Sequence, residues 1–316
     1  MYKLAAILGG VLLLVLLAGW LVTWQRTGRV EALYPPVGEV RRIGSVELHF
    51  TDQGQGPALI LLHGASTNLR DFSLLKSDLL QAGYRVMAVD RPGSGYSTQD
   101  DDQWIDPAGQ AGLVAELARQ QGVDRSIWVG HSLAGSVVMA GLLHHPDQVS
   151  AGVMLAGAAY DWPGGVDLMD HLPGIPLLGP IFSHSLVAPL GSLMFDRGLQ
   201  SAFDPEPPTP EYRQTTGIDL YLRPGQFAAT ARDIRLLSPY LAGQSLRYGE
   251  IHQPVLLIHG DKDDIVPAWN HADRLVKILP DARYLTVAGA GHLPHHTRRG
   301  DVARWISEFG RLVDSP

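Results

Sequence analysis

The sequence predicts an α/β fold: a mostly parallel, eight-stranded sheet flanked by helices, with a helical cap insertion and an N-terminal transmembrane helix. Three observations predict it. Short apolar runs alternate with segments whose apolar residues recur at helical spacing, which is typical of parallel strands covered on both faces. A stretch from about 160 to 250 shows no clear strand. The chain also opens on an apolar segment long enough to cross a bilayer.

The composition narrows the class of protein. A length of 316 residues fits one large domain or two small ones, and 45% hydrophobic residues can supply a sizeable core. The net charge is −7 without a basic cluster, which argues against nucleic acid as a partner. The absence of cysteine excludes disulfides, thiolate metal sites and a cysteine nucleophile.

The N-terminal segment predicts a membrane anchor. Leu4–Trp24 is 21 residues without a charge, and at 1.5 Å per residue it matches the roughly 30 Å hydrocarbon core of a bilayer. A cleaved signal peptide is the alternative, but the apolar run is longer than usual and no small-x-small cleavage site follows it. We expect an anchor over 1–27, a linker over 28–38 and a folded domain over 39–316. Basic residues flank the span on both sides, so the sequence leaves the membrane side open.

The strands of the folded domain are predicted from their apolar runs and the turns between them. The first two are joined by Gly44-Ser45, which predicts a hairpin. Most of the others are short and continuously apolar, as in strands buried on both faces. The expected strands are Glu39–Ile43, Val46–Thr51, Ala58–Leu62, Arg85–Val89, Ile127–Val129, Gly152–Leu155, Val255–Ile258 and Arg283–Val287.

The segment from about 160 to 250 is predicted to be a helical insertion over one edge of the sheet. It is rich in Pro and Gly, holds several apolar patches and is too long for a plain connection. Within it, Asp204–Pro210 contains four prolines and predicts an irregular turn.

A serine between a strand and a helix is the main chemical signal. The apolar run Ile127–Val129 leads into Gly130-His131-Ser132-Leu133-Ala134-Gly135, and an apolar helical run follows. A turn of this kind lifts the Ser132 hydroxyl to a helix N-terminus, where free N–H groups favour developing negative charge. The segment predicts a serine nucleophile.

A nucleophilic serine needs a base and an acid that orients the base. Downstream, the apolar run that ends at Ile258 leads into a turn with Asp261, Asp263 and Asp264. The next strand is followed by a glycine-rich loop that ends at His292. Both segments lie beyond strand ends, where sites in open α/β sheets form.

In this order of motifs, the chain resembles the α/β-hydrolase fold family over roughly residues 40 to 315. The motifs are His63-Gly64, Asp90 to Ser97, Gly130 to Gly135, Gly260 to Pro267, and Gly291-His292. The resemblance implies that Ser132 is the nucleophile, His292 the general base and acid, and Asp263 the orienting carboxylate. It also implies an oxyanion hole from the backbone N–H groups of Ala65 and Leu133, and a cap after the sixth strand.

The chain departs from the family pattern at two points. The turn has Ala134 where the family has glycine, and Gly135 comes one place late; alanine is small, so we expect close strand–helix packing to survive. Three aspartates crowd the acid turn. In the family, the acid stands three residues after the glycine and four before the proline, which only Asp263 satisfies.

No metal site is predicted. His292, His295 and His296 lack a HExxH pattern and a paired carboxylate at helical spacing. For His63 we expect a role in ordering its loop, and for His131 a surface or packing role.

These observations predict a membrane-anchored serine hydrolase that cleaves an apolar carboxylic ester through an acyl-enzyme and needs no cofactor. Thioesterase, amidase, carbon–carbon hydrolase and perhydrolase chemistry could use the same three groups. A hydrolase-like binding or scaffold protein with little turnover is the alternative from another class. The sequence does not predict the oligomeric state.

Overall fold

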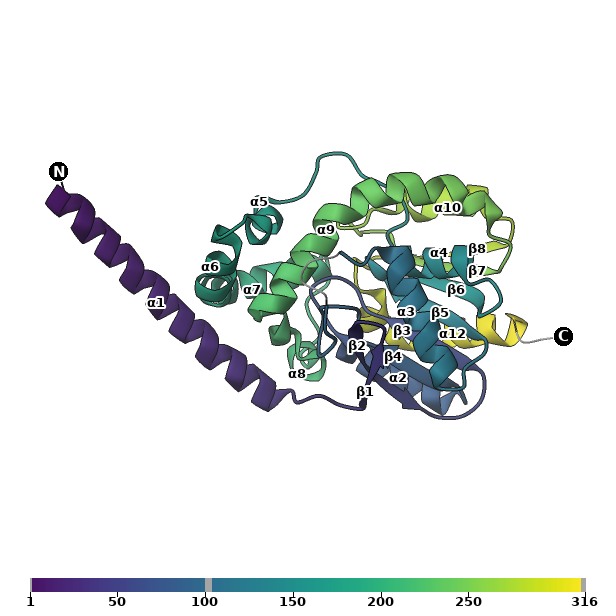
Figure 1. Ribbon diagram of the computed structural model, residues 1–316. Coiled ribbons are helices and arrows are strands. Elements are labelled where there is room, and N and C mark those ends of the chain that lie inside the picture. Colours follow the sequence, from purple (N-terminus) through teal and green to yellow (C-terminus); the bar gives the residue numbers. More distant parts are fainter. Residues whose placement is uncertain (1, 100–103, 314–316) are drawn as a thin grey trace.

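The computed structural model describes residues 2–99 and 104–313. An eight-stranded sheet lies between two layers of helices, a group of helices covers one edge of it, and a long N-terminal helix projects from the molecule beside that group (Figure 1). The predicted fold class is confirmed.

The sheet is mixed, with strand order β1-β2-β4-β3-β5-β6-β7-β8. The pairs β1/β2 and β2/β4 are antiparallel and all other neighbours are parallel. Ile43 pairs with Val46 across the predicted hairpin turn. Every expected strand is present, some of them longer than predicted: β1 (Glu39–Ile43), β2 (Val46–Gln53), β3 (Ala58–Leu62), β4 (Arg85–Val89), β5 (Ser126–His131), β6 (Val149–Leu155), β7 (Val255–Gly260) and β8 (Ala282–Val287).

Helices bury both faces of the sheet, which explains why its strands are continuously apolar. In β3, Ile60 and Leu62 pack into one core and Leu59 and Leu61 into the other. The first core is closed by α3 (Pro107–Gln120), α4 (Ala134–His144) and α10 (Ala272–Ile278). The second core is closed by α2 (Ser73–Gln81) and α12 (Arg299–Val313).

The cap is inserted between β6 and β7, at the place that the resemblance implies. Its described residues form helices and turns without a strand, and Asp204–Pro210 is irregular as predicted. The cap elements are α5 (Leu168–His171), η2 (Leu172–Gly174), α6 (Leu178–Ser185), α7 (Val187–Phe203), α8 (Tyr212–Thr216), η3 (Ile218–Leu222), α9 (Pro224–Gln244) and η4 (Ser245–Glu250).

The N-terminal helix α1 (Tyr2–Leu33) is longer than the expected anchor. Residues 28–33, expected in the linker, are helical. The helix ends only before Pro35-Pro36, because nothing earlier breaks it and a residue that precedes proline avoids the helical conformation. The ion pair between Glu31 and Arg223 (3.1 Å) also holds this last part of α1 on the cap.

Helix α1 is long and apolar enough to cross a membrane. None of the residues in its most apolar window is buried. The cap pair α6 and α7, bent by 62° at their junction, passes the same test of length and composition if the two helices are taken together.

Candidate active site

The turn after β5 presents Ser132 at the end of the sheet. Ser132 has a φ of 52°, a left-handed conformation that costs energy in a residue with a Cβ. The backbone around it is fixed, since the Ser132 N–H donates to the Leu155 carbonyl (3.0 Å) and the Ser132 carbonyl accepts from the Ala158 N–H (2.9 Å). Gly130 has no room for a side chain, because a Cβ there would lie 2.6 Å from the Ala134 carbonyl oxygen.

The departure at Ala134 agrees with this close packing. Ala134 is fully buried, so the methyl group is accommodated between strand and helix. Gly135, one place later, has no room for a side chain, since a Cβ there would lie 2.7 Å from the Gly157 Cα. Both small residues let α4 start close to the ends of β5 and β6.

The loop after β8 carries His292 to the serine. The distance from His292 Nε2 to Ser132 Oγ is 2.9 Å, and the distance from His292 Nδ1 to Asp263 Oδ2 is 2.8 Å. An ionised carboxylate only accepts, so Nδ1–H donates to Asp263 and the Nε2 lone pair is left to accept the serine proton. The structure therefore brings together the three side chains that the sequence singled out.

The carboxylate of Asp263 is buried and held by several hydrogen bonds. Its Oδ1 accepts from the backbone N–H groups of Ile265 and Val266 (2.9 Å each), and His259 Nε2 lies 3.2 Å from its Oδ2. Burial alone would raise the pKa of Asp263, but the charge of His292 and the hydrogen bonds from His259 and His292 outweigh it. The pKa therefore lies well below its usual range, and the group is ionised at neutral pH.

The other two aspartates of the turn, Asp261 and Asp264, have different surroundings. The carboxylate of Asp261 accepts from the Gly289 N–H (2.7 Å), and Asp264 faces a cavity on the outer side of His292. The contact of His259 with Asp263 is one that sequence reasoning missed, although His259 stands four residues before the aspartate.

Ala65 and Leu133, the expected oxyanion donors, line the same cavity as Ser132. Leu133 directly precedes α4, so its N–H belongs to a helix start where N–H groups lack intrahelical partners. Gly64 brings the other strand end up to the serine, because a Cβ there would lie 3.0 Å from the Ser132 Cβ.

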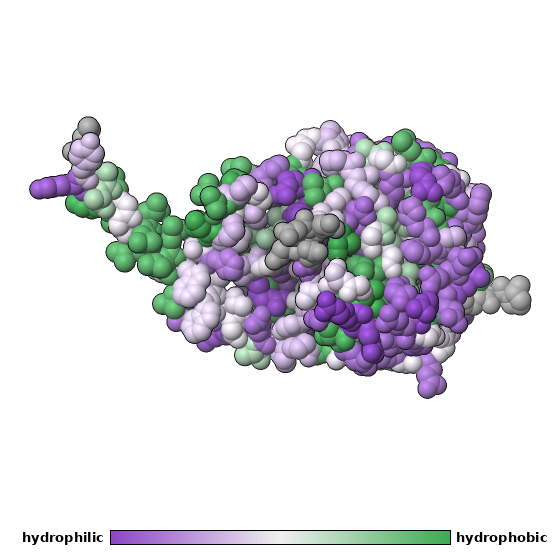
Figure 2. Space-filling view, in the orientation of Figure 1, coloured by the Kyte–Doolittle hydropathy of each residue, from purple (hydrophilic) through white to green (hydrophobic). Residues whose placement is uncertain are grey.

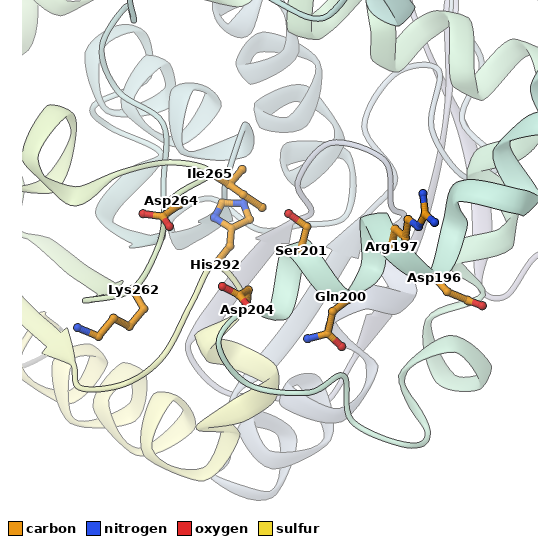
Figure 3. Close-up of a pocket in the computed structure, with 9 residues that line it drawn as sticks. All are labelled: Asp196, Arg197, Gln200, Ser201, Asp204, Lys262, Asp264, Ile265 and His292. Carbon is orange, nitrogen blue, oxygen red and sulfur yellow. The ribbon is translucent and has the colours of Figure 1, made fainter.

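Two cavities flank Ser132 and His292. The one on the Ser132 side has a volume of about 590 Å³ and a mostly apolar wall that includes Leu133, Trp162, Ile234 and Leu237. The one on the His292 side has a volume of about 600 Å³, and most residues that line it have polar or charged side chains (Figure 3). In Figure 3, helix α7 faces the loops that carry His292 and Asp264. The residues that line the cavity on the His292 side are Asp196, Arg197, Gln200, Ser201, Asp204, Lys262, Asp264, Ile265 and His292.

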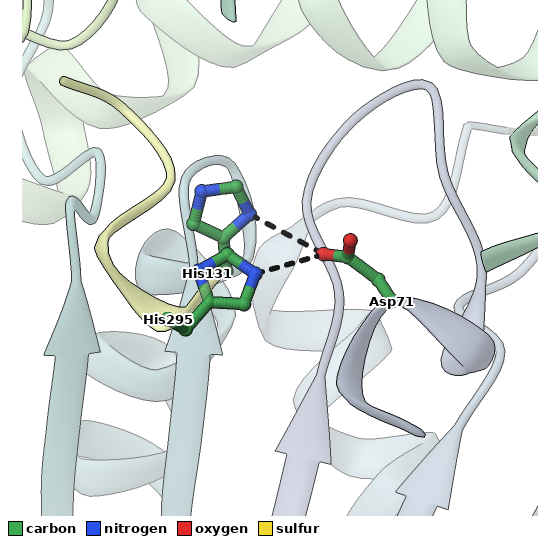
Figure 4. A group of neighbouring side chains, drawn as sticks. All are labelled: Asp71, His131 and His295. Atoms are coloured by element: carbon green, nitrogen blue, oxygen red, sulfur yellow. Dashed lines mark hydrogen bonds and ion pairs between the residues drawn. The ribbon is translucent and has the colours of Figure 1, made fainter. Parts of the chain in front are cut away.

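Asp71, His131 and His295 form a buried polar network (Figure 4), and the His131 ring lies beside the His292 ring. His131 Nε2 lies 3.0 Å from the His292 carbonyl oxygen, which only accepts, so this nitrogen carries the proton. The other nitrogen of His131, Nδ1, lies 3.8 Å from Asp71 Oδ2. The Asp71 carboxylate accepts from His295 (3.1 Å) and His296 (2.9 Å). Burial lowers the pKa of His295 to about 4, and the charge of His296 adds to this.

The ligand-type atoms of Asp71, His131 and His295 all lie within 4.8 Å of one another. The sequence argument against a metal looked for a carboxylate at helical spacing. The structure brings one from η1 (Leu69–Phe72), far away in the sequence. His131, for which we expected a surface or packing role, links the turn that carries Ser132 to the backbone of the His292 loop.

A buried arginine fixes the strand end that carries Ala65. Arg91 Nε donates to the His63 carbonyl (2.9 Å), and its Nη1 pairs with Asp233 of cap helix α9 (2.8 Å). The Arg91 N–H donates to His63 Nε2 (3.0 Å), and His63 Nδ1 donates to the Gly64 carbonyl (2.8 Å). His63 therefore orders its loop, as the sequence predicts. The role of Arg91 was missed because its partners are distant in the sequence.

The comparisons with known proteins agree with this architecture. The family model described as "Alpha/beta hydrolase family" matches residues 59–305. The chain belongs to this family, and it is a hydrolase.

Among named relatives, the chain is 28% identical over 285 residues to a pimeloyl-[acyl-carrier protein] methyl ester esterase of Xanthomonas axonopodis pv. citri (strain 306). The match covers 83% of this chain and 98% of that protein. It is also 28% identical over 267 residues to a 2-hydroxy-6-oxo-6-phenylhexa-2,4-dienoate hydrolase of Burkholderia cepacia, covering 79% and 86%. A solved structure described as a membrane phospholipase A, a novel bacterial virulence factor, aligns with a TM-score of 0.68 and 23% identity. That alignment covers 100% of both chains.

Proposed function

We propose that this protein hydrolyses carboxylic esters through Ser132, His292 and Asp263. One observation carries the proposal: a continuous chain of hydrogen bonds joins the serine hydroxyl, the imidazole and a buried ionised carboxylate, at 2.9 and 2.8 Å. Such a chain activates a serine that would otherwise be a poor nucleophile.

The reaction follows from where the protons sit. Ser132 Oγ attacks the ester carbonyl carbon as its proton passes to His292 Nε2, and Asp263 stabilises the imidazolium that forms. The backbone N–H groups of Ala65 and Leu133 hold the oxyanion. His292 then gives its proton to the alkoxide oxygen as the carbon–oxygen bond breaks. Water attacks the acyl-enzyme by the same steps in reverse.

The two cavities favour an ester with two unlike halves. The leaving alcohol must lie on the His292 side, because His292 protonates it, and most residues that line that cavity have polar or charged side chains. The acyl group then lies on the Ser132 side, where the wall is apolar. The relatives named as a methyl ester esterase and a membrane phospholipase A agree with an ester-cleaving role. We propose an apolar acyl group and a polar alcohol as the substrate class.

Carbon–carbon hydrolysis is the second candidate, because a relative of equal identity is named as a dienoate hydrolase. A series of p-nitrophenyl esters of rising acyl length, with a thioester, an amide and a vinylogous diketone compared at equal concentration, separates these chemistries. We expect the esters to be turned over fastest.

The proposal is tested by replacing Ser132 with alanine. Ser132→Ala should abolish labelling by a fluorophosphonate probe and lower p-nitrophenyl butyrate turnover by at least about 10³-fold. Ser307→Ala makes the same chemical change inside α12 and should leave both unchanged. Full turnover in Ser132→Ala would overturn the proposal, and a wild-type serine inert to the probe would favour a binding protein.

We also propose that α1 spans a membrane as a single-pass anchor. It is long and apolar, and none of its most apolar window is buried. The full chain should float with phosphatidylcholine vesicles and resist extraction by sodium carbonate, with an intact N-terminus. Release by carbonate, or a cleaved N-terminus, would contradict the anchor.

A further inference from the structure

The cap exposes large apolar side chains on the elements beside α1. Leu172–Phe195 contains no Asp, Glu, Lys or Arg. Figure 2 shows that the hydrophobic surface of α1 meets hydrophobic surface on the adjoining part of the molecule. We use the name apolar cap face for the large apolar side chains that the cap exposes in this region. They are Leu168, Met169, Ile175, Leu177, Leu178, Ile181, Leu190, Leu193 and Met194. Soluble proteins rarely expose a cluster of this kind without a partner.

The cap touches α1 inside its uncharged segment. A Cβ on Gly19 would collide with the backbone carbonyl oxygen of Ser185, so α1 and α6 meet backbone to backbone. One turn later, Thr23 is 3% exposed. The more buried positions of α1 recur every three or four residues, which makes one stripe that packs on the cap.

The level of this contact decides what surrounds α6. Gly19 lies five residues before Trp24, the end of the uncharged segment, and at 1.5 Å per residue that is about 7 Å inside the boundary. If α1 spans a bilayer, whatever packs on Gly19 lies at the depth of the acyl chains. Helix α6 contains no Asp, Glu, Lys or Arg. Its polar residues Ser183 and His184 line the cavity that Arg232 and Arg235 also line.

Charged residues follow at the level expected for lipid headgroups. Just beyond Trp24, Arg26 and Arg29 of α1 line a cavity together with Arg223 of the cap. A second cavity beside Thr27 and Glu31 is lined by further cap arginines, Arg232 and Arg235. Along α1, the protein thus changes from apolar to basic at the place where a bilayer changes from acyl chains to phosphates.

We propose that the apolar cap face is immersed in the membrane next to α1, with lipid acyl chains as its occupant. The proposal rests on the proposed span of α1. Interfacial elements with one apolar face typically sink about 5–10 Å into the boundary of the acyl chains, which agrees with the level of Gly19. A protein partner on this face would itself have to lie within the bilayer. The cap therefore rests in the membrane and is held there by two elements, α1 and α6–α7.

The absence of cysteine in the chain allows a direct test. Single substitutions Leu178→Cys and Leu193→Cys place a thiol on the apolar cap face, at side chains that are 61% and 79% exposed. Leu14→Cys (67% exposed) marks the span, and Leu246→Cys (85% exposed) marks a cap position on η4, outside the apolar cap face. Each full-length variant is labelled with a nitrobenzoxadiazole fluorophore and reconstituted in phosphatidylcholine vesicles.

Vesicles that contain lipids with a nitroxide on the acyl chain then report the depth of each label. We expect strong quenching at Leu14, Leu178 and Leu193 and little at Leu246. Quenching at Leu14 without quenching at Leu178 and Leu193 would overturn the proposal while the anchor stands. No quenching at Leu14 would overturn the anchor, and the immersed cap with it. Turnover of p-nitrophenyl butyrate by each variant shows that it is folded.

Discussion

At the edge of the sheet, the polar side chains of the site are buried and joined by hydrogen bonds, whereas the cap presents large apolar side chains to its surroundings. Asp263 is 6% exposed and accepts from two backbone N–H groups and from histidines. Leu193 in cap helix α7 is 79% exposed. Hydrogen bonds hold the polar groups at the edge of the sheet in place, while large apolar side chains of the cap remain uncovered by the rest of the protein.

The largest loss of activity is expected when Asp263, the carboxylate in the turn after β7, is replaced. Asp263→Asn should lower kcat for p-nitrophenyl butyrate by about 10⁴-fold, because an amide donor favours the wrong tautomer of His292. Asp264→Asn makes the same change one residue away, at a carboxylate that faces the cavity on the His292 side, and should cost far less. Steady-state kinetics of both variants decide between them, and equal losses would contradict the assignment of the acid.

The two regions are tied together by a buried ion pair. Asp233→Asn removes the carboxylate charge that pairs with Arg91 and leaves one acceptor oxygen for the two donors Arg91 and Trp104, so it should lower the free energy of unfolding by about 3–5 kcal/mol. Asp301→Asn, at an exposed pair with Arg304, should change it by at most about 0.5 kcal/mol. Urea unfolding in detergent measures both. A small effect at Asp233 would show that the cap is held independently of this pair.

The buried histidines of the sheet make its stability depend on pH. Burial, together with the charge of Arg91, lowers the pKa of His63 to about 4. The unfolded chain, with an ordinary pKa near 6.5, takes up the proton first as the pH falls. The stabilisation is therefore complete above about pH 6.5 and is lost towards pH 4, by roughly 2 kcal/mol between pH 7 and 4.5. Burial shifts the pKa of His271 in the same direction, to about 3.

Urea midpoints at pH 7 and 4.5 test this contribution. His63→Gln cannot titrate, so the variant should lose less stability on acidification than the wild type does. An equal loss in both proteins would remove His63 from the explanation.

The smallest effect on stability is expected from a substitution on the apolar cap face. Leu193→Ala should change the free energy of unfolding in detergent by at most about 0.5 kcal/mol, because the side chain makes few contacts within the protein. Leu61→Ala, at a fully buried position of β3, is the matched control and should cost about 2–5 kcal/mol. Comparable losses at both positions would mean that the cap face packs against the protein itself.

Much of the fold could be predicted because its signals are local. Each strand is a short apolar run, and the turn at Ser132 has its sequence signature within six residues. Helix α1 continues to Leu33, into residues that we expected in the linker. A charge does not break a helix; the prolines at 35 and 36 do.

The sequence by itself determined the alternation of strands and helices, the uncharged N-terminal segment, and the order in which Ser132, Asp263 and His292 follow the ends of strands. These depend on residue type and spacing, and parallel strand ends must meet at one edge of the sheet. Only the tertiary structure decided that Asp71 lies beside His131, that Asp233 pairs with Arg91, and that α6 meets Gly19. Contacts between residues so far apart depend on how the elements pack, and no local pattern records them.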